Sequence, residues 1–435
     1  MINRFDILYA AGTVLSSPVW LARRASRRKV LRAFRERLGH VPRRDPGRPA
    51  VMIHAVSLGE MNATRELVRL LQTARPDLHV IVSTTTDTGH ARGRQLYGWS
   101  PDVTLIRFPL DFTGAICRAL SRLRPQLVVL LELEVWPNFM LQCERRGIPV
   151  VLVNGRMTEH SFKRYGMLPD SVVEPMFRRL TRVCAQDQTY ANRFIELGTS
   201  PSRVSVTGTM KFDTAHVSDR IAGDDQLAAA LGLRTGVEPV WVCGSTGPGE
   251  EEIVLRAYRH LLNRFARLRL VIVPRKPERF DEAAQLVEQF HFKCLRRSRN
   301  DPPPVDPPVP PVILGDTMGE LRKFYSLADV VFVGRTLVDL GPRQHGSDMI
   351  EPAALAKPVI VGPHTGNFAE AMIKLRQDDA IVEVSDEAML TEAVRLLLAT
   401  PERAEPMGKR AQDVVRREQG ATARHAQVIL DLLKT

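Results

Sequence analysis

The chain has few cysteines, and they form no recognisable metal or redox motif. The five cysteines lie at least 26 residues apart, at Cys117, Cys143, Cys184, Cys243 and Cys294. There is no Cys-x-x-Cys pair, which excludes zinc-finger and thioredoxin-type motifs. An odd, scattered set favours buried free thiols in a reducing compartment.

Acidic residues are fewer than basic ones, and aromatic residues make up only 6% of the 435 residues. The 61 lysines and arginines against 49 acids give a net charge of +12. Residues 1–48 hold 12 basic and 3 acidic residues, or +9, so the rest of the chain carries only +3. A nucleic-acid-binding domain normally carries basic patches and stacking aromatics on its folded body. The nearly neutral body therefore argues against a nucleic-acid partner and for an anionic partner near the N-terminus.

No uncharged run reaches the length of a full bilayer span, which needs about 20 apolar residues. Ile7–Ala22 is uncharged over 16 residues, and a basic cluster from Arg23 to Arg37 follows it. A cleaved signal peptide has its charge before the apolar run, and the positive-inside rule would keep this cluster in the cytoplasm. Two membrane interpretations stay open, a short anchor or an interfacial helix on anionic lipid. The alternative is a buried helix with a solvated basic face.

Beyond residue 48, short apolar runs alternate with amphipathic helical stretches, which predicts βαβ units and parallel sheets. The predicted strands form two sets: Ala50–Val56, His79–Thr85, Val103–Phe108, Leu127–Leu131, Val150–Asn154, Arg182–Gln186 and Val204–Gly208, then Val240–Gly244, Leu268–Pro274, Val312–Gly315, Val330–Gly334, Val359–Gly362 and Ala380–Val384. We therefore predict an α/β protein with two Rossmann-like domains, at residues 49–215 and 237–435. A linker at 216–236 joins them, and a membrane-attachment segment with its basic arm occupies residues 1–48.

Ligands of open parallel sheets bind beyond the carboxyl ends of the strands, so the residues after each strand are site candidates. Glu60 follows the first strand and starts a helix, where it is either a general base or an ordinary first-turn glutamate. Glu132 and Glu134 follow the strand Leu127–Leu131, and in an extended chain they point the same way. Each is either functional or paired with nearby arginines or backbone. Lys211 follows the last strand of the first set and either faces an anion or is simply solvated.

The second set carries candidate anion-binding segments. Gly244–Glu250, with Ser245 and Thr246, joins a strand to a helix and has free backbone N–H groups for a phosphate; a plain turn is the alternative. It matches neither the Walker A nor the GxGxxG spacing. Pro274 and Arg275 end another strand, where a guanidinium can grip a phosphate. Two helix starts complete the set, at Met318, Gly319, Glu320 and Leu321, and at Asp348, Met349, Ile350 and Glu351. Glu351 could accept hydrogen bonds from ribose hydroxyls.

Taken in order, HAVSLGE, ELEVWPN, TGTMKFD, GSTGPGEE, PRKPERF, GDTMGEL and MIEPAA followed by PVIVGPHTGNF span almost the whole chain. Together these blocks resemble the family of 3-deoxy-D-manno-octulosonic acid (Kdo) transferases, which move Kdo from CMP-Kdo to a lipid A precursor, lipid IV(A), in lipopolysaccharide synthesis. The resemblance implies the GT-B glycosyltransferase fold, with two Rossmann-like domains facing across a cleft. It also implies an inverting, metal-independent reaction without a cofactor, at the cytoplasmic face of the inner membrane.

The resemblance also implies roles for the candidate residues. Glu60 would deprotonate the acceptor hydroxyl, and Glu132 and Lys211 would stabilise the transition state. The donor CMP-Kdo would be bound by Ser245, Thr246, Pro274, Arg275, Met318, Gly319, Glu320, Leu321, Asp348, Met349, Ile350 and Glu351. The partners would be this nucleotide sugar, a phosphorylated glycolipid acceptor and the inner membrane surface.

The chain departs from the family pattern near the expected donor site. Lys276 stands where the family often has His, and Asp348 where an Asn-type residue is usual. Gly247-Pro248 replaces a usual His-Glu pair. The block from Gly334 to Gly346 is about four residues longer than the corresponding block of the family, which usually contains a pair of glycines. Asp348 would repel a phosphate unless the positive charge of Arg335 or Arg343 compensates. Two alternative functions stay open, a GT-B enzyme that uses a UDP- or GDP-sugar, and a non-catalytic binding protein on this scaffold.

Overall fold

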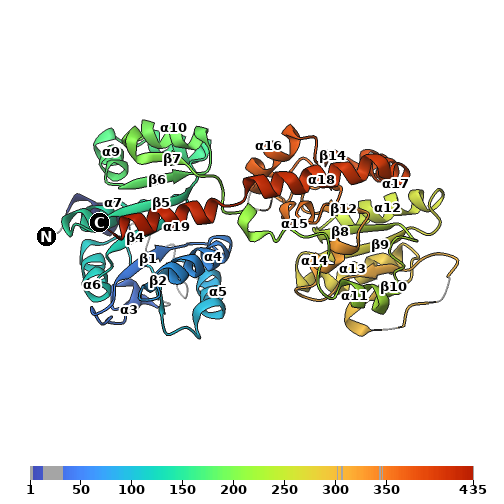
Figure 1. Ribbon diagram of the computed structural model, residues 1–435, viewed down its shortest axis with the longest axis horizontal. Helices are drawn as coiled ribbons and strands as arrows, with labels where there is room; N and C mark the ends of the chain where they lie inside the picture. Colours follow the sequence, from blue (N-terminus) through green and yellow to red (C-terminus); the bar gives the residue numbers. More distant parts are fainter. Residues whose placement is uncertain are drawn as a thin grey trace. The chain divides into compact units, whose positions relative to one another are not determined.

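The computed structural model describes residues 3–12, 33–300, 302–304, 307–341, 344 and 346–434. The chain forms two compact units, Met1–Thr214 with Gln419–Thr435, and Ala215–Glu418 (Figure 1). Each unit has a seven-stranded sheet with helices on both faces, and every strand pair within the described residues is parallel (Figure 1). The predicted α/β fold is therefore confirmed.

The sheet of the first unit has the strand order β3-β2-β1-β4-β5-β6-β7. Its strands are β1 (Ala50–His54), β2 (His79–Thr84), β3 (Val103–Arg107), β4 (Leu127–Leu131), β5 (Val150–Gly155), β6 (Arg182–Ala185) and β7 (Val204–Val206). Their apolar side chains are buried on both faces because helices cover both. The chain order reverses between β1 and β4, and a ligand crevice forms at the carboxyl ends of strands at such a reversal.

Helices follow nearly every strand of the first unit. They are α3 (Phe34–Arg37), α4 (Leu58–Ala74), α5 (Asp87–Tyr97), α6 (Thr113–Leu123), α7 (Pro137–Arg145), α8 (Glu159–Gly166), α9 (Asp170–Arg178), α10 (Gln188–Glu196) and, from the end of the chain, α19 (Ala421–Leu432). Helix α4 shows why these segments are helical, since Met61, Leu67, Val68 and Leu71 recur at helical spacing and are buried.

The N-terminal residues pack on the first unit. Residues 4–12 are helical, and the Asp6 carboxylate accepts the backbone N–H of Thr113 at 2.8 Å. Arg37 and Arg44, assigned to the basic arm from the sequence, donate to the backbone carbonyls of Thr85 and Leu123 at 2.6 and 2.8 Å. The predicted boundary at residue 48 therefore does not separate an arm from this unit, because residues 33–48 are part of its packing.

The predicted membrane segment is described only in part. Its residues 13–22, and the basic residues as far as Arg32, lie outside the described residues. Within the helical residues 4–12, Ile7 and Leu8 are 64% and 65% exposed. In the part of the chain that the structure describes, no helix combines the length and apolarity that a membrane crossing requires.

The second unit has the strand order β10-β11-β9-β8-β12-β13-β14, which reverses between β8 and β12. Its strands are β8 (Val240–Thr246), β9 (Arg269–Pro274), β10 (Cys294–Arg296), β11 (Val312–Leu314), β12 (Val330–Val333), β13 (Val359–Val361) and β14 (Val382–Glu383). Its helices are α11 (Asp224–Leu231), α12 (Glu250–Leu262), α13 (Phe280–Gln289), α14 (Leu321–Leu327), α15 (Ile350–Ala353), α16 (Ala369–Gln377), α17 (Glu387–Ala399) and α18 (Pro401–Glu418). Strand β10 was not predicted, because only Leu295 of its three residues is fully buried.

Two segments belong to a different unit from the one predicted from the sequence. Helix α11 lies inside the predicted linker 216–236 but belongs to the second unit, where buried Asp224 contacts the hydroxyl of Ser326. Residues 419–435 were assigned to the second domain, but helix α19 belongs to the first unit. Asp213 caps this helix by accepting the N–H of Gly420 at 2.6 Å, and His425 Nε2 lies 2.9 Å from the Thr207 hydroxyl.

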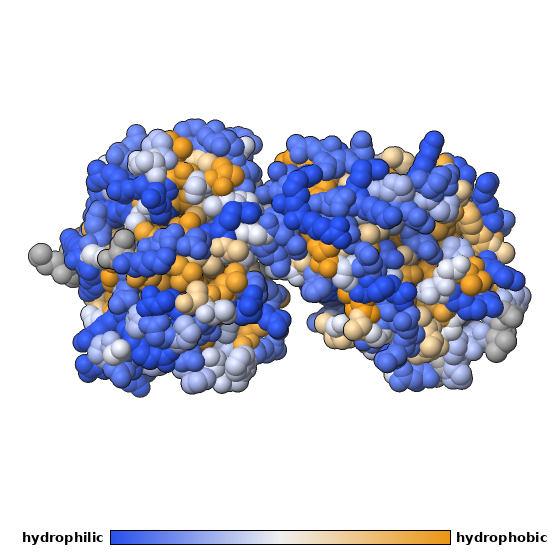
Figure 2. All heavy atoms as spheres, viewed as in Figure 1, coloured by the Kyte–Doolittle hydropathy of each residue, from blue (hydrophilic) through white to orange (hydrophobic). Residues whose placement is uncertain are grey.

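Polar side chains dominate the drawn surface, and three of the five cysteines are buried. On the face drawn in Figure 2, hydrophilic side chains cover most of both units, and hydrophobic areas are smaller and interrupted. All five cysteines are free, with Cys143, Cys184 and Cys243 buried. Burial raises the pKa of the Cys143 thiol to about 12, so this thiol is not activated as a nucleophile.

Candidate active site

Glu60 lies at the carboxyl end of β1, beside the strand-order reversal of the first sheet. Ser57 caps helix α4 by accepting the Glu60 N–H at 3.2 Å. In return, Glu60 Oε2 accepts the N–H of Val56 at 2.8 Å, and Oε1 accepts that of Ser57 at 3.3 Å. This reciprocal capping box fixes the carboxylate at the sheet edge. The first-turn interpretation of Glu60 is therefore correct for its local structure, and it leaves a chemical role open.

The electrostatic surroundings of Glu60 suit a general base. Burial, and after it the charge of Glu132, raise the pKa of Glu60 to about 7, against the hydrogen bond from Val56 that lowers it. Glu134 raises it further. A carboxyl group with a pKa near neutrality can take a proton from a hydroxyl and return it to solvent at physiological pH.

Glu132 follows β4, the strand paired with β1 at the reversal. Its backbone is left-handed, with φ of 58°, and its N–H donates to the Val153 carbonyl at 3.1 Å. A left-handed glutamate costs free energy, and such strain gathers at functional sites. The expectation that Glu132 and Glu134 extend the strand in the same direction is wrong, because β4 ends at Leu131 and a turn follows.

Two aromatic side chains lie beside Glu134. Trp136 Nε1 donates to Glu134 Oε2 at 2.8 Å. The buried His54 ring stacks on Phe108, with ring centroids 3.9 Å apart, and places Nε2 3.8 Å from the same oxygen. The Trp136 hydrogen bond orients Glu134, whose charge acts on Glu60, and no pattern in the sequence predicts that His54 lies beside Glu134.

Lys211 lies in a turn after β7, just before a short 3-10 helix at Phe212–Thr214. Asn154, at the end of β5, accepts the N–H of Met210 at 3.0 Å through its side-chain oxygen. Like Glu132, Asn154 is left-handed. The amide therefore fixes the Lys211 turn at the edge of the sheet that also carries Glu60 and Glu132.

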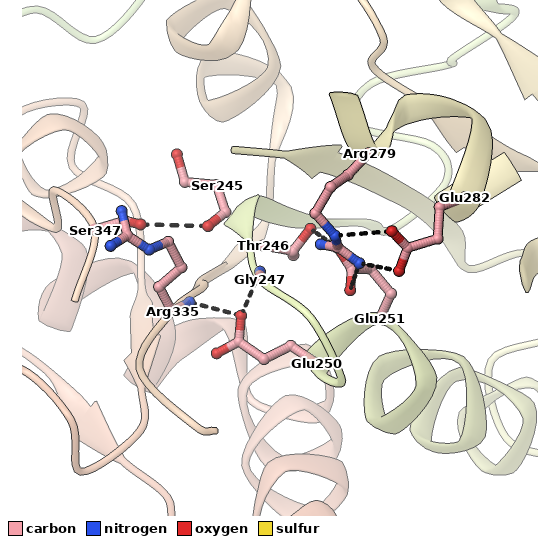
Figure 3. Close-up of polar contacts among 9 residues, drawn as sticks. All are labelled: Ser245, Thr246, Gly247, Glu250, Glu251, Arg279, Glu282, Arg335 and Ser347. Carbon is pink, nitrogen blue, oxygen red and sulfur yellow. Dashed lines mark hydrogen bonds and ion pairs between the residues drawn. The ribbon is translucent and has the colours of Figure 1, made fainter. Parts of the chain in front are cut away.

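In the second unit, the glycine-rich segment is held by two buried carboxylates (Figure 3). Ser245 and Thr246 complete β8, and Ser245 is left-handed. Glu250 Oε2 accepts the N–H groups of Gly247 at 2.8 Å and of Arg335 at 2.6 Å. Because Glu250 takes the Gly247 N–H, this donor does not contribute to the phosphate cradle that the sequence suggested.

Glu250 and Glu251 bind different partners around the glycine-rich segment. Glu250 Oε1 accepts two further N–H groups, from Thr336 and Leu337, each at 2.9 Å. Glu251 accepts the Thr246 hydroxyl at 2.8 Å and pairs with Arg279 at 2.6 Å (Figure 3). Neither role was predicted from the sequence. A run of glutamates at a helix start was the available signal, but their partners lie far along the chain.

Arg275 follows Pro274 at the carboxyl end of β9, and its backbone N–H donates to the Thr246 carbonyl at 3.0 Å. Its side chain is exposed and has no ion pair with a carboxylate among the described residues. The guanidinium is therefore placed at the sheet edge and available to an anion.

The segment from Met318 to Leu321 leads into α14. Met318 is 69% exposed and Gly319 is left-handed, with φ of 86°. The Glu320 carboxylate accepts the Thr317 hydroxyl at 2.6 Å and pairs with Arg297 at 3.1 Å. Glu320 thus fixes this segment, and only its remaining lone pairs could reach a ligand.

Asp348 to Glu351 form the start of α15. Asp348 Oδ1 accepts the Ile350 N–H at 2.9 Å, whereas the side chains of Met349 and Ile350 are fully buried and can offer a ligand only their backbone. Burial, and after it the charge of Asp348, raise the pKa of Glu351 to about 7, against Arg322 and Arg275. The predicted donor residues Arg275, Asp348 and Glu351 are therefore electrostatic neighbours.

Comparison with known proteins identifies the family. Residues 32–214 match the family model described as 3-deoxy-D-manno-octulosonic-acid transferase. The chain is 36% identical over 393 residues to the 3-deoxy-D-manno-octulosonic acid transferase of Haemophilus influenzae, covering 89% of this chain and 87% of the relative. The chain belongs to the Kdo transferase family. The transferase of Bordetella pertussis is 34% identical over 389 residues, covering 88% and 87%.

Solved structures confirm the fold of this Kdo transferase family member. A glycosyltransferase from Rickettsia africae has a TM-score of 0.58 at 12% identity and covers 89% of this chain and all of that chain. UDP-GlcNAc 2-epimerase from Neisseria meningitidis also has a TM-score of 0.58, at 15% identity, covering 88% and 99%. These structures show the GT-B fold that the resemblance implied, and membership of the Kdo transferase family makes the protein a glycosyltransferase. At these identities the two structures show the fold alone.

Proposed function

We propose that the protein transfers Kdo from CMP-Kdo to a phosphorylated lipid A precursor, lipid IV(A), during lipopolysaccharide synthesis. Its membership of the Kdo transferase family supports the reaction class. The observation that carries the proposed mechanism is the position of Glu60. It lies at the strand-order reversal of the first sheet, its carboxylate is fixed by a capping box, and its pKa is raised to about 7.

The proposed reaction is a single displacement. Glu60 accepts the proton of an acceptor hydroxyl as the hydroxyl oxygen bonds to the anomeric carbon of Kdo. The bond from that carbon to the CMP phosphate oxygen breaks, CMP leaves with the electron pair, and the anomeric configuration inverts. Glu132 stabilises charge that develops on the sugar, and Lys211 and Arg275 stabilise negative charge. The family resemblance implies that no metal takes part, so activity should persist in EDTA.

A donor competition experiment tests this function against the rival GT-B donors. CMP release from CMP-Kdo should depend on lipid IV(A), and added CMP should inhibit it as the product. UDP and GDP at the same concentration should have little effect. Inhibition by UDP or GDP but not by CMP would contradict the proposed donor, and binding of the donor without any turnover would favour a non-catalytic protein.

The proposal includes attachment to the cytoplasmic face of the inner membrane. Exposed Ile7 and Leu8, together with the +9 charge of residues 1–48, support it, since apolar contact and basic residues add in binding anionic lipid. The full-length protein should sediment with anionic vesicles, and an Ile7→Asp, Leu8→Asp variant should stay largely in the supernatant. Equal sedimentation of the two proteins would show that this helix does not make the attachment.

A further inference from the structure

Arg335 lies at the strand-order reversal of the second sheet, two residues after β12 and opposite the end of β8. Its backbone is left-handed, with φ of 60°. Glu250 fixes its N–H at 2.6 Å, and its carbonyl accepts the N–H of Gly346 at 2.7 Å. A left-handed arginine costs free energy that a glycine would not, so the backbone at Arg335 is strained.

The Arg335 guanidinium group makes few hydrogen bonds within the part of the chain that the structure describes. Its Nε is buried and has no hydrogen-bond partner among the described residues. One terminal nitrogen donates to the Gln344 carbonyl at 3.1 Å. Glu250 is a nearby carboxylate, but its oxygens already accept four backbone N–H groups.

The second cation at this edge is Arg275. Burial, and after it the charge of Arg275, lower the pKa of Arg335, whereas Glu250 raises it. The charge of Arg275 also lowers the pKa of Glu351, which burial and Asp348 raise to about 7. Neither arginine makes an ion pair with a carboxylate among the described residues. An anion held by both guanidinium groups would offset their repulsion, and bidentate guanidinium geometry suits phosphate oxygens.

We propose that Arg335 binds the phosphate of the nucleotide-sugar donor together with Arg275. This inference rests on the proposed function for the presence of such a donor. The strand-order reversal places the pair where open α/β sheets bind ligands, and the backbone strain at Arg335 is maintained by that role. The pair also supplies the positive charge that a phosphate needs beside Asp348.

Replacement of Arg335 by glycine distinguishes a role of the side chain in donor binding from a role in the stability of the fold. In the full-length protein, titration calorimetry should show at least tenfold weaker CMP binding for Arg335→Gly, with cytidine binding unchanged. The melting temperature should not fall, because glycine accepts the left-handed backbone. Arg124→Gly is the matched control, since Arg124 is also left-handed but lies in the first unit, and its CMP affinity should equal that of the wild type.

Three results would overturn the assignment. Unchanged affinity for CMP and an unchanged KM for CMP-Kdo would remove Arg335 from the donor site. Unchanged CMP affinity with a raised KM for CMP-Kdo would show that Arg335 binds the sugar carboxylate and not the phosphate. Equal losses for CMP and cytidine with a lower melting temperature would make its role structural. If the wild type instead prefers UDP, the proposed donor is wrong, and UDP with uridine gives the same test of Arg335.

Discussion

Replacement of Glu60 with glutamine should lower kcat for Kdo transfer by about 10³-fold, within the range that loss of a general base produces. Glutamine has nearly the shape of glutamate, and its side-chain oxygen can still accept the N–H of Val56, which now bonds to Glu60 at 2.8 Å. Helix α4 should therefore stay capped while the proton acceptor is lost. Kinetics with CMP-Kdo and lipid IV(A), together with CMP titration of the variant, measure the two effects separately.

The pH dependence makes this prediction specific to Glu60. Because the pKa of Glu60 is raised to about 7, the wild-type rate should fall about tenfold per pH unit below pH 7. The Glu60→Gln variant should not show this acid limb in its pH–rate profile. A raised pKa means that the folded protein loses stability as pH rises through about 7. The glutamine variant should therefore melt at a higher temperature than the wild type at pH 8.

The control for Glu60 lies on the same helix. Glu66 is on α4 and pairs with Arg69 at 2.6 Å on the surface, so Glu66→Gln should keep the wild-type rate and pH profile. If Glu60→Gln retained activity within a few-fold and the same acid limb, Glu60 would be only a helix cap, and the base would be another group.

Replacement of Glu250 with alanine should lower the free energy of unfolding by about 3–5 kcal/mol, because removing one partner of a buried charged network leaves the others unsatisfied. Four backbone N–H groups, those of Gly247, Arg335, Thr336 and Leu337, lose their acceptor. Urea unfolding of the full-length variant measures this loss. Donor affinity should fall as well, since Glu250 fixes the backbone of Arg335.

A neighbour on the same helix provides the comparison. Glu252 is also in the first turn of α12, but its carboxylate pairs with Arg256 at 2.5 Å at the surface. Glu252→Ala should therefore change stability little, as exposed ion pairs do. Similar unfolding curves for the two variants would contradict the role given to Glu250.

The sequence predicted the strands well because parallel strands buried on both faces leave nearly continuous apolar runs. It also predicted Glu60, Glu132 and Arg275 as candidate site residues, since each follows such a run, and their roles stay predictions. Glu250 is a residue whose role could not be predicted from the sequence. Its role depends on the backbone of residues 335–337, about 85 positions away, and only the folded sheet brings them together.

The same limit explains the remaining differences. The apolar residues of α19 fit either core, so their spacing could not show that the helix joins the first unit through Ala426 and Ile429. The sequence predicts an extended Glu132, because a left-handed φ of 58° has no sequence signal in a residue other than glycine or asparagine. Arg335 was named from the sequence only as a possible counter-charge for Asp348, and its strain was invisible there.

The most direct test of the central claim is the intact mass of the lipid acceptor. Detergent-solubilised protein is incubated with a tetra-acylated lipid A precursor and CMP-Kdo made in situ, and the lipid is analysed by mass spectrometry. We predict a product heavier by one or more Kdo units, which is absent with Glu60→Gln. An unchanged acceptor mass with the wild-type protein, under conditions where an established Kdo transferase gives product, would contradict the account.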